Sequence, residues 1–432
     1  MDALATDTIS TQRPISRRRR LARRGFMPMA YAGLLLFTIV YFGRPGDWIP
    51  ALSTIPLAKI SGAVAVLSFV FSAIAVRGNF RISREAILLV ALFSQFCLSV
   101  PFAYFRTGSF WVVFGVFLKI LVIVLSLMFA VNSIQRLVKL LSFQTAAMAI
   151  MAAVSASSYR GGRAEGVVGG DFNNPNDFAL SVVLVLPLAF TFFISSRGFV
   201  RRAIWALAFA LLCYAVLITY SRTGFLALIA AAIAGIFQYR HEFIERPLLV
   251  VGIGITAITL IALGPVNYWH RTATIFHPEE DETGSAQQRE FLLRRSVTLT
   301  LENPVLGVGP GNFAALSGVW RVTHNTYTEL SCEAGIPALV LFLWLLLRTF
   351  KNLDKVRKTT NAGSSPHLLA SGIRTSMWAL IVGAFFTSLT YHFFPYFLIA
   401  YAVALENIVS IKSTAIPDAN CKTLSGQVPI FL

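Results

Sequence analysis

The sequence predicts an all-α polytopic integral membrane protein, with about twelve transmembrane helices and one large, partly helical loop. Of its 432 residues, 56% are hydrophobic and 13% are charged, and its mean hydropathy is +0.68. Soluble domains are less apolar and carry about twice this share of charge. Apolar runs long enough to cross a hydrocarbon core of about 30 Å recur almost from end to end. No soluble core is needed to explain them.

The predicted spans follow the apolar runs in chain order. Two of the runs, 203–239 and 374–410, are too long for one crossing, because a helix of such length reaches about 55 Å. Each must therefore fold back, and we expect the turns at Ser221-Arg222-Thr223-Gly224 and at Tyr391-His392-Phe393-Phe394-Pro395, where polar residues, Gly or Pro can end a helix. The spans are expected near 27–43, 56–76, 86–105, 110–131, 137–156, 178–196, 203–220, 223–239, 247–265, 336–350, 374–391 and 393–410.

Lysine and arginine in the connections predict the orientation, because short loops rich in these residues stay in the cytoplasm. Both tails are then cytoplasmic, and two longer connections face outward. The net charge of +17 reflects this topology and contact with anionic membrane lipids rather than nucleic-acid binding. The expected division is a basic cytoplasmic tail (1–26), nine spans (27–265, with an outer loop at 157–177), a large outer loop (266–335), three spans (336–410) and a cytoplasmic tail (411–432).

Neither a metal nor a cofactor is expected. The four cysteines, at positions 97, 213, 332 and 421, have neither the spacing of a disulfide framework nor that of a metal site. The acidic run 279–282 lacks the spaced ligands of a calcium loop, and consecutive acids are usually only solvated.

The first outer loop reads SSYRGGRAEGVVGGDFNNPNDF and offers two candidate residues. Its glycines and the Asn-Pro-Asn-Asp stretch suit tight turns and an N-cap for the next span, although Asn176 could also contact a substrate. Arg163 is either a solvated loop charge or a ligand group.

The second outer loop is too long for a simple connector and should contain structure of its own. We expect a helix from about 285 to 302, capped by Ser285 with Gln288 three residues later and ended by Asn303-Pro304. Arg289 shares one face of this helix with Leu292, Leu293 and Ser296, so it is either half-buried packing or a ligand group. The following GVGPGNF stretch predicts a glycine turn, because no Lys-Ser or Lys-Thr follows it as in a nucleotide loop.

The stretch HNTYTELSCEAGIP, residues 324–337, gathers polar groups directly before an apolar run. A histidine at this position can accept a proton near neutral pH, and Glu329 or Glu333 could orient it. The alternative is that His324 only caps the span. Lys119 lies near the middle of a predicted span, where a charge normally faces the bundle interior, as an ion-pair partner or beside a substrate path.

Four stretches together resemble the bacterial O-antigen ligase and O-antigen polymerase superfamily over roughly residues 160–350. They are GRAEGVVGGDFNNPNDFA, SRTG, ENPVLGVGPGNF and HNTYTELSCEAGIP. Arg289 followed by Leu293, and His324-Asn325 followed by Gly335, resemble patterns of the ligase branch. Ala338 departs from the Gly, Thr or Val that this branch prefers there. The resemblance implies a GT-C-like glycosyltransferase architecture, multi-pass in the bacterial inner membrane, with the active site facing the periplasm.

The resemblance also implies the substrates. The donor would be an undecaprenyl-diphosphate-linked glycan. A ligase transfers the glycan to a lipid A-core sugar, whereas an O-antigen or exopolysaccharide polymerase transfers it to another carrier-linked repeat. Transfer to protein is a further alternative. No cofactor would be used, and other polysaccharide-assembly proteins are candidate partners.

Residue roles follow from this chemistry. Without a metal, arginines are the natural groups to stabilise a diphosphate leaving group. Arg163, Arg222 and Arg289 are the candidates, and His324 would be the general base, with Glu329 or Glu333 orienting it or binding sugar hydroxyls. Asn325 and Asn176 are candidate further substrate contacts.

A transporter of an anionic lipid or solute is the alternative from another class, with Lys119 and Arg222 lining its path. Inverted repeats and helices broken near the midplane would mark a transporter. The sequence has no convincing repeat, and its polar groups gather on one face of the membrane, which favours the transferase.

Overall fold

The structure is a computed structural model. It describes residues 17–75, 82–161, 164, 174–245, 247, 251, 252, 254, 262, 266–273, 275 and 284–414. Within these residues the regular elements are all helical, and eight helices are long and apolar enough to cross a membrane. The predicted class, an all-α polytopic membrane protein, is confirmed.

The chain folds into a bundle of long helices joined by short ones. The first half contains α1 (Arg17–Gly43), α2 (Pro45–Trp48), α3 (Leu57–Ala75), α4 (Arg84–Ser99), α5 (Arg106–Phe110), α6 (Leu118–Ala130), α7 (Ile134–Ser157), α8 (Pro175–Ser195) and α9 (Phe199–Ile218). The second half contains α10 (Arg222–Gln238), α11 (Arg240–Glu245), α13 (Val266–Ala273), α14 (Ser285–Glu302), α15 (Phe313–Leu316), α16 (Thr326–Thr359), α17 (Ser365–Gly383) and α18 (Phe393–Thr414). A π-helical stretch, Trp111–Phe117, joins α5 to α6.

Long helices lie over the predicted spans that fall within the described part of the chain. The segment 247–265 lies almost wholly outside it, so the count of twelve and the boundaries of the five predicted regions stay predictions. Two predicted span boundaries differ clearly from the ends of the helices in the structure. The span expected at 336–350 is part of α16, which begins at Thr326 and bends at Gly335, where φ is 84°. The span expected to reach 391 ends at Gly383, the last residue of α17.

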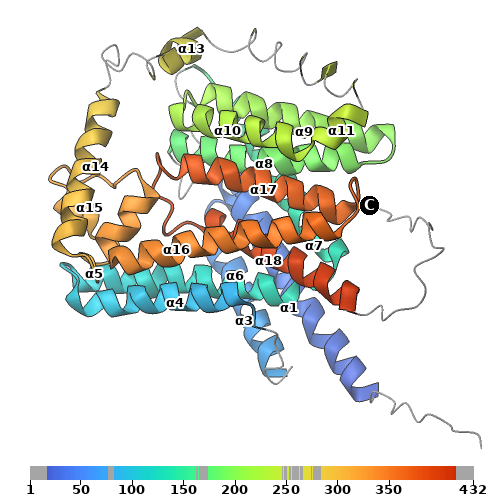
Figure 1. Cartoon of the computed structure of the whole chain (residues 1–432), viewed down its shortest axis with the longest axis horizontal. Helices are drawn as coiled ribbons and strands as arrows, with labels where there is room; N and C mark the ends of the chain where they lie inside the picture. The colour runs from blue at the N-terminus through green and yellow to red at the C-terminus, as the bar shows by residue number, and fades with distance from the viewer. Residues whose placement is uncertain are drawn as a thin grey trace, which may run out of the picture.

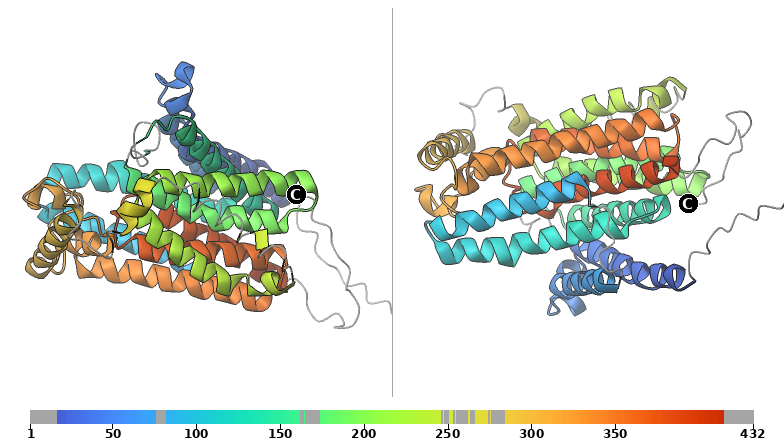
Figure 2. Two further views of the ribbon diagram at one scale, coloured as in Figure 1. Left: turned by 90° about the horizontal axis from the view of Figure 1, so that it is seen from above. Right: turned by 60° about the horizontal axis from the view of Figure 1, so that its bottom comes forward.

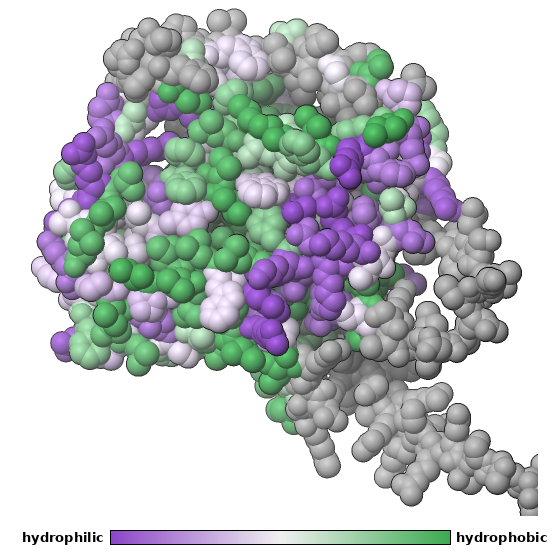
Figure 3. Space-filling model, in the orientation of Figure 1, coloured by the Kyte–Doolittle hydropathy of each residue, from purple (hydrophilic) through white to green (hydrophobic). Residues whose placement is uncertain are grey.

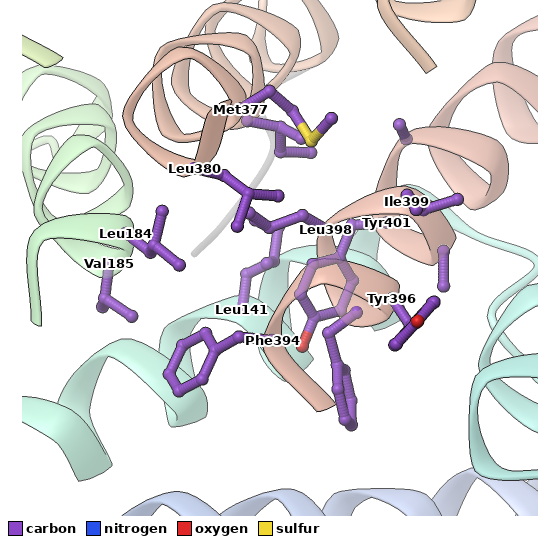
Figure 4. Packing of buried hydrophobic residues seen from close by; sticks show 14 of the residues in the cluster. Leu141, Leu184, Val185, Met377, Leu380, Phe394, Tyr396, Leu398, Ile399 and Tyr401 are labelled. Atoms are coloured by element: carbon purple, nitrogen blue, oxygen red, sulfur yellow. The ribbon is translucent and has the colours of Figure 1, made fainter. Parts of the chain in front are cut away.

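The buried centre of the bundle is α18. Its residues 394–405 are almost all buried, and they pack against α6, α7, α16 and α17. Figure 4 shows this core, where Leu398 and Tyr401 of α18 lie among Leu141 of α7 and Leu380 and Met377 of α17. Tyr401 donates a hydrogen bond to the Gln144 side chain across 2.5 Å, so its hydroxyl is satisfied inside the core.

The helices run side by side, with α14 and α15 at one end of the bundle (Figure 1). The pair α1 and α3 lies at one side and α3 projects away from the rest (Figure 2). Figure 3 shows hydrophobic residues over the middle of one face, with hydrophilic residues over α14 and over the opposite end, where α16 and α17 meet. This banding is what a membrane-spanning bundle requires. The α14 end carries the site.

Candidate functional site

A pocket of about 300 Å³ opens at the end of the bundle that carries α14. It brings together four residues that the sequence singled out: Arg222, Arg289, His324 and Asn325. They come from α10, from α14 and from the segment before α16, so about 100 residues of sequence separate the first from the last. The remaining lining is Thr223, Leu226, Ile275, Ala286, Glu290, Leu293, Thr323, Phe385 and Phe386.

Arg222 is positioned by the turn between α9 and α10, where the sequence predicted a fold-back. The Ser221 side chain caps α10 by accepting the Gly224 N–H at 3.1 Å, which makes Arg222 the first residue of the helix. The Arg222 guanidinium donates to the hydroxyl of Ser285 on α14. The start of α10 and the start of α14 are therefore joined at the pocket.

The expected capping role of Ser285 is wrong. The helix has the predicted bounds, but its N-cap is Gly284, with a φ of 60°, and Ser285 is the first helical residue. The Ser285 hydroxyl binds Arg222 instead, because α10 brings a guanidinium close to it. Local sequence spacing could not reveal this partner.

Asn176 lies beside the Arg222 turn rather than in the pocket lining. Its side-chain oxygen accepts the Ser221 hydroxyl at 2.9 Å. Asn174 caps α8 by accepting the Asn176 N–H at 2.9 Å, as the Asn-Pro-Asn-Asp stretch predicted. Arg163 lies outside the described residues.

Arg289 reaches the pocket because the next turn of α14 is anchored. Leu292 is fully buried and packs in a small core with Leu299, Val308, Phe313 and Cys332. This core fixes α14 against the first half of α16, and Arg289 lies one turn before it. Arg289 is half-buried and lines the pocket, a position that agrees with both roles left open for it, packing and ligand binding.

His324 lies in the segment before α16 and has the left-handed backbone conformation, with a φ of 51°. This conformation is uncommon for a residue other than glycine. The Ser388 hydroxyl holds it by accepting the His324 N–H at 3.1 Å, and it also bonds to the Thr323 hydroxyl at 3.0 Å. Ser388 was not expected as a site residue, because only the tertiary structure brings it here.

Burial lowers the pKa of His324 to about 4, and the charges of Arg289 and Arg321 add to the effect. A buried imidazolium beside two guanidinium groups is unfavourable. The imidazole is therefore neutral above this pH, with a nitrogen that can accept a proton or a hydrogen bond.

The segment 384–392, between α17 and α18, is not helical, and α16 satisfies much of its backbone. The Thr326 N–H donates to the Ala384 carbonyl at 2.8 Å, and the Thr326 hydroxyl donates to the Thr387 carbonyl at 2.7 Å. A Glu329 oxygen accepts the Thr390 N–H at 3.2 Å. Non-helical backbone near a membrane is tolerated only where such partners exist. The polar groups of HNTYTE therefore have a structural use besides the pocket.

Glu333 binds backbone and a tyrosine rather than the pocket. Its carboxylate accepts the N–H groups of Gly311 at 2.7 Å and Phe313 at 3.0 Å, and the Tyr391 hydroxyl at 2.7 Å. Glu329 and Glu333 are both buried, and neither lines the pocket. Through these contacts they connect the glycine turn, α16 and the segment 384–392.

The GVGPGNF stretch is a glycine turn, as predicted, but it also fills the bend in α16. Gly335 frees the carbonyls of Cys332 and Glu333, and these accept the N–H groups of Val308 at 2.8 Å and Gly309 at 2.9 Å. A Cβ at Gly335 would lie 2.1 Å from the Val305 carbonyl oxygen. The Gly-Ile-Pro sequence at 335–337 was the signal for a helix break that could have indicated this.

Two further expectations concern charge. Lys119 is exposed on the bundle surface, so it does not face the interior as predicted. Within the described ranges, no group of three or more His, Cys, Asp or Glu residues is placed to hold a metal ion. The acidic run 279–282 lies outside the described residues.

Residues 206–343 match a family model described as O-antigen ligase. This stretch extends from α9 into α16 and contains every described residue of the pocket except Phe385 and Phe386. No curated protein matches the chain.

Proposed function

Residues 206–343 carry the features of the O-antigen ligase-related superfamily, and from this premise we propose that the chain is a glycosyltransferase of the bacterial inner membrane. It takes a glycan from an undecaprenyl-diphosphate carrier at the periplasmic face and transfers it to a sugar of the lipid A core. Both tails lie in the cytoplasm. The alternative within this class is an O-antigen or exopolysaccharide polymerase.

The observation that supports this proposal is the grouping of Arg222, Arg289 and His324 around one pocket. Two guanidinium groups and a neutral imidazole meet where apolar helices end. A lipid diphosphate is complementary to this arrangement, because its headgroup is anionic and its isoprenoid chain is apolar. Leu226, Phe385 and Phe386 provide the apolar part of the lining.

Arg222 and Arg289 bind the diphosphate in this proposal. Guanidinium groups pair with phosphate oxygens through two parallel hydrogen bonds and stay charged at all relevant pH values. As the bond between the sugar carbon and the diphosphate oxygen breaks, the electron pair moves onto the diphosphate. The two arginines stabilise the developing charge.

His324 is the general base. It takes the proton from the acceptor hydroxyl while the acceptor oxygen forms its bond to the sugar carbon, and attack opposite the leaving group inverts that carbon. The products are the extended acceptor, undecaprenyl diphosphate and a proton on the imidazole, which then passes to solvent. Asn325 caps α16 by accepting the N–H groups of Tyr327 at 3.0 Å and Thr328 at 3.1 Å, and it lines the pocket beside His324, where we assign it a substrate contact.

Donor binding makes His324 a better base. The positive charge of Arg289 contributes to the low pKa of this histidine. A bound diphosphate offsets that charge and raises the pKa toward its ordinary value. The base therefore gains proton affinity when a donor is present, and it stays neutral when the pocket is empty.

Glu329 and Glu333 serve as positioning residues rather than as groups that touch the substrate. Their oxygens accept from Thr390 and from Gly311, Phe313 and Tyr391. They hold the glycine turn and the segment 384–392, and Ser388 of that segment supports His324.

The proposal is tested with purified full-length chain, an undecaprenyl-diphosphate-linked glycan and either lipid A-core or a second carrier-linked glycan. Transfer to lipid A-core alone indicates a ligase, and elongation on the carrier indicates a polymerase. Arg222→Ala and His324→Ala should lower the rate of formation of either product by about 100-fold or more while membrane insertion stays normal. Full activity in either variant contradicts the assigned roles.

A deletion strain provides the cellular test. Loss of long chains on lipid A-core, with full-length polymer accumulating on the carrier, supports the ligase. Single repeats that persist without long chains support the polymerase. An unchanged lipopolysaccharide and exopolysaccharide profile contradicts both.

A further inference from the structure

A second pocket lies on the side of α10, away from the His324 pocket. It has a volume of about 240 Å³ and lies among α8, α9, α10, α11 and α17. Its lining is almost wholly apolar and includes Phe190, Phe209, Ala232 and Ile236. α10 starts at Arg222 in the first pocket and is about 25 Å long, and the second pocket follows it from Leu228 to Tyr239. This pocket therefore extends from mid-membrane toward the opposite membrane surface.

Arginines surround the end of this pocket that is nearer the surface. Tyr239 and Thr375 line the pocket. Arg240 directly follows Tyr239 in the sequence, and Arg374 directly precedes Thr375. Arg357, on the last turns of α16, is close enough to Tyr239 and Arg240 for their charges to interact. The short connection from α8 to α9 and the first turn of α9 add three exposed arginines, at positions 197, 201 and 202.

Several polar atoms in this cluster are buried without a hydrogen-bond partner among the described residues. They include Nε of Arg357 and Oε1 of Glu242. Nε of Arg374 also has no partner among the described residues, although the terminal nitrogens of this arginine pair with Asp354 at 3.2 Å and with the Gln238 side chain at 3.1 Å. Buried unsatisfied groups are rare in native proteins, and a bound water, ion or ligand is one of their ordinary explanations.

We propose that this site binds an anionic phospholipid whose headgroup carries hydroxyl groups, such as phosphatidylglycerol, from the leaflet opposite the His324 pocket. Part of one acyl chain occupies the apolar pocket. The phosphate accepts hydrogen bonds from Arg357 and Arg240, and a headgroup hydroxyl donates to Glu242. A basic pocket between helices at a membrane surface is the feature that recognises anionic lipid headgroups.

The pocket size agrees with this occupant. It is slightly smaller than the roughly 300 Å³ at which pockets for drug-sized ligands begin, so it fits a segment of one chain rather than a whole lipid. The polar groups all lie at one end, which matches a ligand with its charge at one end. The proposal does not depend on the transferase activity.

The experiment titrates the full-length chain in detergent with dioleoyl-phosphatidylglycerol or dioleoyl-phosphatidylcholine and counts bound lipid by native mass spectrometry. The wild-type chain should retain one phosphatidylglycerol about tenfold more tightly than phosphatidylcholine, the size of a charge-assisted hydrogen-bond contribution. Arg357→Gln should remove this preference through the headgroup. Ala232→Trp, which fills the pocket at an exposed position, should weaken binding through the chain.

The controls are Lys351→Gln and Leu343→Trp, at exposed positions of α16 outside this pocket. Both should keep the lipid preference. Arg240→Gln, at an exposed position, tests the headgroup contact if Arg357→Gln does not fold. Equal retention of the two lipids by the wild-type chain, or an unchanged preference in both Arg240→Gln and Ala232→Trp, overturns the proposal.

Discussion

The two fold-backs of the chain, between α9 and α10 and between α17 and α18, look alike in sequence but differ in structure. Each was expected inside an apolar run too long for one crossing. The first is a tight turn at residues 219–221, closed by the Ser221 cap. The second covers nine residues, 384–392, and takes its partners from Thr326, Glu329 and Glu333.

This difference shows how the pocket is built. The tight turn satisfies its own backbone, so it can present Arg222 with few outside contacts. The long segment cannot, and α16 supplies the polar groups that it lacks. The same contacts hold His324 beside Arg289. A local turn can thus position the backbone of Arg222, whereas His324 needs contacts from a segment that is distant in the sequence.

The largest expected effect is the loss of transfer when a pocket group is removed. Arg222→Ala, Arg289→Ala and His324→Ala should each lower kcat/KM by about 100-fold to 1000-fold, because charge stabilisation and proton transfer contribute at this scale. Rates are measured with purified chain and carrier-linked donor.

The matched controls are Arg294→Ala, on the exposed face of α14, and His392→Ala, outside the pocket lining. Both should transfer at nearly the wild-type rate. A loss in the controls as large as in the pocket variants means that charge or histidine content, rather than the pocket, sets the rate.

The next effect concerns stability. Glu333→Ala leaves the N–H groups of Gly311 and Phe313 and the Tyr391 hydroxyl without their acceptor. Since each buried unsatisfied group costs about 1–3 kcal/mol, we expect a loss of about 3 kcal/mol or more in the free energy of unfolding. Denaturant unfolding in detergent measures it. Glu302→Ala, at an exposed position of α14, is the control and should change little.

A smaller stability effect tests the tight fold-back. A Cβ at Gly224 would lie 2.7 Å from Cβ of Ala179 on α8, whereas a Cβ at Gly235 of the same helix would meet its nearest atom at 3.9 Å. Gly224→Ala should therefore destabilise the chain by about 1–3 kcal/mol through overpacking. Gly235→Ala should be neutral or slightly stabilising. Equal unfolding midpoints for the two variants would show that α8 and α10 are not packed as closely as described.

A moderate catalytic effect tests the long fold-back. Ser388→Ala removes the hydroxyl that accepts the His324 N–H, and we expect kcat to fall about tenfold while KM for the donor stays nearly constant. Ser388→Thr keeps a hydroxyl and should restore most of the rate. If Ser388→Ala changes KM and kcat together, or if threonine does not restore the rate, Ser388 does not act by positioning His324.

The smallest effect is on pH dependence. The neutral imidazole is the active form, and the His324 pKa is about 4, so kcat/KM should be level near neutral pH and fall as the pH drops toward that value. Arg289→Gln removes one cause of the low pKa, so its residual activity should begin to fall at a higher pH. The shift should be modest, because burial is the larger cause. Identical pH profiles for the two proteins would argue against electrostatic coupling between Arg289 and His324.

Much of the protein was determined by the sequence alone. Hydropathy and the length of the apolar runs predicted the helical membrane fold, because a bilayer admits only segments that satisfy their own backbone. The fold-back before Arg222 and the helix 285–302 were also visible, since caps and breakers act within a few residues. The candidate residues Arg222, Arg289, His324 and Asn325 came from chemistry and resemblance, and they share one pocket.

Only the tertiary structure decided how these residues are held. Ser285 binds Arg222 instead of capping its helix, Ser388 supports His324, and Glu333 holds the glycine turn. The end of α17 at Gly383 was also decided by the tertiary structure, because backbone groups of the segment that follows find their partners in α16. Local spacing carries no information on contacts between residues 60 or more positions apart, such as His324 and Ser388. These contacts depend on how α10, α14, α16 and α17 pack together.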